Sequence, residues 1–169
     1  MTDERSPRNE RQELLGGHSA GGLRRSPFYV LNDDEIEFIK SEIQAIKADV
    51  EVFHFNEGLF TQYVDESDVI LINGNIFPDV HSLHPRDIMS VRAVLAHEYY
   101  GHRAFRGTSA EPQSWNDEFR ASYSAAKNAP NLSDEDRRYL VLDALERTKE
   151  AGIKIKSNSF IRSVLYGYQ

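Results

Sequence analysis

The residues whose types and spacing could bind a metal ion lie in the stretch LAHEYYGHRAF, residues 95–105. It contains His97, Glu98 directly after it, and His102. In the zinc-hydrolase signature H-E-x-x-H, the two histidines stand four positions apart and therefore share one face of a helix. Here the histidines are five positions apart. At 3.6 residues per turn, five positions rotate a side chain by about 140°, against about 40° for four, so a regular helix would separate the two imidazoles.

On a regular helix, His102 and Glu98 would share an apolar stripe with Leu95, while His97 would lie beside Val94. In that interpretation His102 is a core histidine with a local hydrogen bond. It also leaves the Glu98 carboxylate on the apolar stripe, where an unpaired charge is costly to bury. Something would have to compensate that charge.

A one-residue bulge in the last turn is the alternative, because it would bring the His102 imidazole to about 40° from that of His97. Gly101 stands where such a distortion is needed. A glycine inside a helix otherwise costs about 0.5–1 kcal/mol relative to alanine, although Gly101 could equally be a helix C-cap. With the bulge, both histidines could bind one ion.

A catalytic zinc normally takes three protein ligands and keeps one position for water. On the following helix, Glu118 falls on or beside the apolar face that Trp115 and Phe119 help to define. A carboxylate turned inward there would complete a site of two histidines and one glutamate. Glu118 could also be an acid of the first helical turn favoured by the helix dipole, as could Asp117.

HEYYGH resembles the H-E-x-x-G-H motif of the dipeptidyl-peptidase III family of zinc peptidases, and DEFRAS at 117–122 resembles that family's E-E-x-R-A-[ED] motif. The resemblance implies that His97, His102 and Glu118 are zinc ligands and that Glu98 is the general base. It implies that Asp117 is an acid hydrogen-bonded to a ligand histidine. The sequence departs from the family at Asp117, which replaces glutamate, at Ser122, which replaces the last acid, and in the short separation of the motifs.

The resemblance covers residues 97–102 and 117–121, in a chain much smaller than those exopeptidases. It implies the wider zincin plan, in which a sheet lies on a metal-binding helix and a second helix brings a glutamate. The chain is similar in size and order to compact metallopeptidase modules of bacterial secreted toxins and effectors. We therefore expect an α+β fold, a minimal zincin-like domain with a small mixed or antiparallel sheet.

The elements that must position these residues follow from hydrophobic periodicity and capping signals. The pattern predicts a helix at 33–48, strands at 50–55, 58–64 and 68–73, and one uninterrupted motif helix at 85–105. Capping-box patterns at Ser114 with Asp117 and at Ser133 with Asp136 predict two further helices, the second ending at Gly152. The tail from 153 suggests a strand and a partial helix.

Composition limits the function classes. The 169 residues carry a net charge of −7 and include no cysteine, so nucleic acid is an improbable partner and any zinc must be held by His, Asp or Glu. No apolar run approaches the roughly 20 residues that span a bilayer, and no signal peptide is evident. We expect a flexible leader at 1–26, a single catalytic domain at 27–169, and a cytoplasmic protein without membrane contacts, with delivery as a secreted effector left open.

The expected function is zinc-dependent hydrolysis of a peptide or protein substrate, with Glu98 as general base. The stretch at 68–73 could hold an extended peptide if it formed a sheet edge, and it could equally be a plain strand of the core sheet. Tyr123 and His81 are among several candidates for stabilising the oxyanion. A structural zinc site, or hydrolysis of a non-peptide bond, remains an alternative, and the sequence leaves the oligomeric state open.

Overall fold

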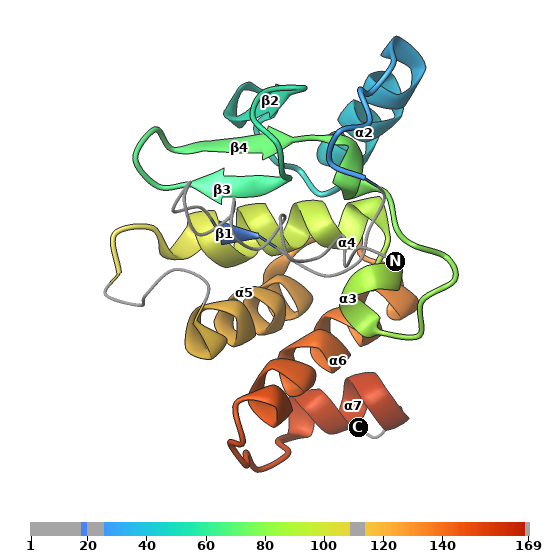
Figure 1. Cartoon of the computed structure of the whole chain (residues 1–169). Helices are drawn as coiled ribbons and strands as arrows, with labels where there is room; N and C mark the ends of the chain where they lie inside the picture. The colour runs from blue at the N-terminus through green and yellow to red at the C-terminus, as the bar shows by residue number, and fades with distance from the viewer. Residues whose placement is uncertain (1–17, 20–25, 109–113, 168–169) are drawn as a thin grey trace, which may run out of the picture.

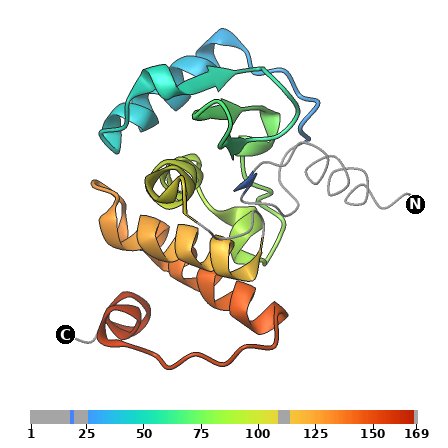
Figure 2. The same ribbon diagram turned by 90° about the vertical axis from the view of Figure 1, so that its left-hand side faces the viewer.

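The computed structural model describes residues 18–19, 26–108 and 114–167. It shows an α+β fold in which the motif helix lies between a small sheet on one side and helices α5 and α6 on the other (Figures 1 and 2). The expected fold class is confirmed. Of the predicted leader, His18–Ser19 form strand β1, and the prediction for the rest of residues 1–25 lies outside the described residues.

The sheet is mixed, with strand order β1-β3-β4-β2. Strand β2 (Phe53–Phe55) pairs parallel to β4 (Val69–Ile72), and β3 (Gln62–Val64) pairs antiparallel to both β4 and β1. The sequence left open whether 68–73 forms a sheet edge or an inner strand, and the structure shows an inner strand, because β4 lies between β3 and β2. Residues 50–52, predicted as strand, form a 3-10 turn, η1 (Val50–Val52), whose backbone Asp49 caps.

Helix α2 (Asp33–Ala45) begins with a capping box between Asn32 and Glu35 and contacts α4. The 3-10 turn η2 (Gly74–Ile76) follows the sheet. The isoleucines of α2 and the inner residues of β4 and α4 form one apolar core: Ile39, Ile43, Ile46, Ile70, Ile72, Val94 and Leu95. This core anchors the motif helix beneath the sheet.

The prediction of one uninterrupted helix at 85–105 is wrong at residues 89–90, which lie outside any helix. The stretch consists of α3 (Pro85–Ile88), α4 (Val91–Ala96), the π-helix η3 (His97–His102) and the 3-10 turn η4 (Arg103–Phe105). Helix α3 ends before Met89, and the new helix α4 begins after Ser90. The Ser90 side chain caps α4 because it accepts a hydrogen bond from the Ala93 amide.

Helix α5 (Trp115–Asn128) packs against both η3 and α6 (Asp134–Glu150). The capping box at Ser133 is confirmed, and at Ser114 the side chain accepts from the Asp117 amide. The tail forms helix α7 (Ser159–Tyr166) and no strand at residues 153–158, so that part of the prediction is wrong. Within the described residues, no helix is both long enough and apolar enough to cross a membrane.

Candidate metal centre

The six residues HEYYGH adopt a π-helical turn, which confirms the expected bulge. The hydrogen bonds at the end of this turn have the π-helical spacing. The amide of Arg103 donates to the carbonyl of Glu98, five positions earlier, as well as to that of Tyr99, four positions earlier. The wider turn brings the rings of His97 and His102 to a centroid distance of 4.7 Å, nearly perpendicular to each other. Their Nε2 atoms lie 3.0 Å apart.

The structure shows why position 101 is a glycine, which the sequence alone did not reveal. A Cβ atom at this position would lie 2.5 Å from the carbonyl oxygen of Ala121 and 2.6 Å from its Cα. The absence of a side chain therefore lets α5 approach η3 closely. The C-cap interpretation is wrong, because the helical backbone continues through η4. This close approach brings Glu118, near the start of α5, to the two histidines.

The expected ligand atoms converge. The Nε2 of His97 lies 3.1 Å from Oε2 of Glu118, and the Nε2 of His102 lies 3.5 Å from its Oε1. With bonds of 2.0–2.1 Å to a tetrahedral zinc, neighbouring ligand atoms are separated by about 3.3 Å. The two Nε2 atoms and the two oxygens of the Glu118 carboxylate, together called the triangle below, lie at separations close to this value, so the three side chains could hold one metal ion. All three are buried.

Polar side chains that contact Nδ1 on the far side of each ring determine which nitrogen faces the triangle. Ser122 donates its hydroxyl hydrogen to Asp143, so its oxygen accepts from Nδ1 of His97 at 2.8 Å. The Nδ1 of His102 lies 3.2 Å from the Asp117 carboxylate, which can only accept when ionised. Both Nδ1 atoms therefore carry hydrogen, and each Nε2 can present a lone pair to an ion. Asp117 thus lies beside the Nδ1 atom of His102.

The charges inside the triangle also fit a cation. Burial would lower the pKa of His102, but Glu118 and Asp117 outweigh it and raise the pKa to about 10. Burial lowers the pKa of His97. For Glu118, burial favours a raised pKa, yet the positive His102 and Arg147 hold that pKa well below its usual value. Without a metal, a proton on His102 balances the carboxylate, and a divalent cation could take that proton's place.

Sequence reasoning missed a buried group on α6 that supports the site. Asp143 is fully buried, accepts from Ser122, and lies 3.3 Å from Nε of Arg147. Arg147 in turn reaches Oε2 of Glu118 at 3.5 Å. Asp143 thus contacts the His97 ring through the Ser122 hydroxyl. The available signal was an aspartate on the buried stripe of α6, between Leu140 and Ala144.

If the triangle binds zinc, replacing Asp143 by asparagine should weaken that binding by about 10- to 100-fold. The new amide can donate to Ser122 Oγ, which frees the hydroxyl to donate to His97 Nδ1 and favours the wrong imidazole tautomer. Competition with a calibrated chelator measures the effect. Asp136→Asn changes another buried acid of α6, bonded to Ser90, and should keep wild-type affinity. Equal affinity in both variants would refute the role of Asp143.

Glu98 is fully buried, and its Oε2 accepts a hydrogen bond of 3.0 Å from the amide of Tyr63 in β3. A ligand-type atom of Glu98 lies within 4.8 Å of such atoms on His97 and His102. This bond from the sheet holds the carboxylate beside the triangle. The arrangement allows Glu98 to act on a water molecule next to an ion.

The two oxyanion candidates do not join this cluster. Tyr123 stacks on Phe119, meets Phe160 edge to face, and its hydroxyl accepts from the side-chain amide of Asn158, so its contacts are on the α7 side of α5. His81 is exposed in the loop before α3, where its amide donates to Asp79. The structure supports neither residue as an oxyanion donor.

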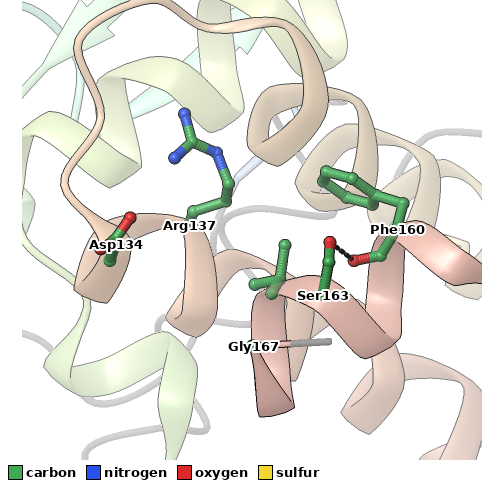
Figure 3. Close-up of a pocket in the computed structure, with 6 residues that line it drawn as sticks. Asp134, Arg137, Phe160, Ser163 and Gly167 are labelled. Carbon is green, nitrogen blue, oxygen red and sulfur yellow. Dashed lines mark hydrogen bonds between the residues drawn. The ribbon is translucent and has the colours of Figure 1, made fainter. Parts of the chain in front are cut away.

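Two other features are separate from the triangle. A surface pocket of about 360 Å³ lies between the start of α6 and α7, lined by residues such as Asp134, Arg137 and Ser163 (Figure 3). Ser163 there donates to the Phe160 carbonyl. His84, Glu146 and Glu150 form another group of acids and imidazole, but Arg86 already neutralises Glu150 at 2.9 Å.

No family model, curated protein or solved structure was found that matches this chain.

Proposed function

We propose that this protein is a zinc-dependent hydrolase of the zincin type, most simply a metalloendopeptidase. The observation that carries the proposal is the convergence of the Nε2 atoms of His97 and His102 with the Glu118 carboxylate, at separations of 3.0–3.5 Å. Both motifs that resemble the dipeptidyl-peptidase III family thus supply groups to one cluster. Their meeting across η3 and α5 supports a shared role.

A bound zinc ion would lower the pKa of its water and polarise the carbonyl of the scissile bond. The chain's own part is proton transfer. Glu98 accepts the proton of the attacking water and delivers it to the leaving amine. The amide of Tyr63 keeps the Glu98 carboxylate oriented during both transfers. Ser122 and Asp117 keep the imidazoles in the binding tautomer.

One observation favours a second candidate, a structural zinc site that ties η3 to α5. His97, Glu98, His102 and Glu118 are each at most 4% exposed, and structural zinc sites are closed to solvent. Glu98 argues for the hydrolase, because a structural site has no use for a buried carboxylate next to its first ligand. The same metal and base could also hydrolyse a non-peptide bond.

The test begins with zinc bound per chain, measured by plasma mass spectrometry on the wild type and on a His97→Ala, His102→Ala double variant. We expect one equivalent in the wild type and none in the variant. The zinc-loaded protein is then incubated with a mixed peptide library, and products are identified by mass. A chelator should stop cleavage and added zinc should restore it. A wild type that fails to bind zinc after reconstitution would contradict the proposal.

A further inference from the structure

Strand β1 consists of the two residues His18–Ser19, from the segment that precedes the first helix. It pairs antiparallel with β3, with His18 opposite Tyr63 and Ser19 opposite Gln62. In the sheet order it is the outermost strand on the β3 side (Figure 1). The outer edge of β3 is therefore occupied by the chain's own N-terminal region.

That edge lies directly at the candidate site. β1 contacts the π-turn η3, which carries the histidines, as well as β3. Tyr63, the residue opposite His18, is also the one whose amide donates to Glu98. The backbone at position 18 therefore passes beside the proposed general base.

The candidate site is closed in this structure. His97 and Glu98 are 0% exposed, and His102 is 4% exposed. A hydrolase must admit its substrate, so some element has to move. Extended peptides bind by adding a strand to an available sheet edge, and β1 occupies the edge nearest to Glu98.

We propose that residues 18–19 form an inhibitory strand, which occupies the edge of β3 where an extended substrate would bind and keeps the site closed until it is displaced. This rests on the proposed hydrolase function. The pairing covers only two residues, so few backbone hydrogen bonds hold it and a longer peptide can compete for the edge.

The test uses the full-length chain with His18→Pro and Ser19→Pro together, since proline lacks the amide hydrogen and fixes φ. The matched control, His18→Ala with Ser19→Ala, keeps both backbone amides. Three quantities are measured: hydrogen exchange of the peptides covering residues 60–64 and 97–102 in metal-free protein, the rate at which a chelator removes bound zinc, and the KM for a cleaved peptide. Intact mass confirms that residues 1–25 remain attached.

The proline variant should show faster exchange in both segments, faster zinc removal and a lower KM, each by about tenfold, the effect of one or two lost backbone hydrogen bonds. The alanine control should behave as the wild type. A synthetic peptide QELLGGHSAGGLRR, residues 12–25, should slow exchange in the proline variant again. Equal exchange in all three proteins would overturn the inhibitory strand. Failure of the hydrolase proposal looks different: exchange still responds to proline, but no protein cleaves peptide.

Discussion

Glu98→Gln should abolish hydrolysis while leaving one zinc bound per chain. The glutamine amide cannot take the proton of the attacking water, and loss of a general base typically costs about 10²- to 10⁴-fold in rate. The fold should tolerate the change, since the amide oxygen can still accept from the Tyr63 amide, as Oε2 of Glu98 does. Zinc stoichiometry and kcat are measured on the same preparation.

Glu51→Gln serves as the matched control, because Glu51 is an exposed acid in the 3-10 turn η1. It should keep both zinc and kcat. Two results would contradict the role assigned to Glu98. Loss of zinc in Glu98→Gln would make Glu98 a ligand, and unchanged kcat would require a different base. The structural zinc site predicts no hydrolysis in either variant or in the wild type.

The distortion at the motif could be predicted from the sequence because it is a local consequence of spacing. Histidines five apart can meet only if one extra residue enters the turn, and residues 97–102 form that π-turn. Glu118 could be expected by a similar argument, since it lies on the inward face of its own helix. In both cases the evidence sits within a few residues of the group concerned, where helical periodicity is a dependable guide.

The features that the sequence did not reveal depend on contacts between distant segments. Asp143 meets Ser122 only after α5 and α6 pack together, and neither residue shows this partner locally. Strand order is also non-local, which is why the sequence left open whether 68–73 forms an edge strand or an inner strand, and in the structure β4 lies between β3 and β2. From the sequence, the glycine at position 101 was attributed to the conformation of its own helical turn. In the structure, it is the backbone of Ala121 on α5 that leaves no room for a side chain there. The break at Ser90 is the exception, because a serine N-cap is a local signal.

Arg147 and Asp143 lie next to the triangle, and their positions suggest a second role for Glu118 besides binding a metal ion. Its carboxylate lies 3.5 Å from the guanidinium of Arg147, which is nearly buried and also contacts Asp143. The negative charge of Glu118 therefore separates a fixed cation from the place where zinc would bind. A ligand that both binds zinc and shields it from a neighbouring positive charge should be the most sensitive acid in the site.

Glu118→Gln should accordingly weaken zinc binding by more than the roughly 100-fold upper range expected for groups that only support a ligand, such as Asp143. The variant keeps the shape of the side chain but removes its charge, so Arg147 is left facing the metal. Chelator competition measures the affinity, and circular dichroism checks the fold. Glu150→Gln is the matched control from the other acidic group, beside His84. If Glu150→Gln loses zinc and Glu118→Gln retains it, the ion binds near His84 and the triangle is not the metal centre.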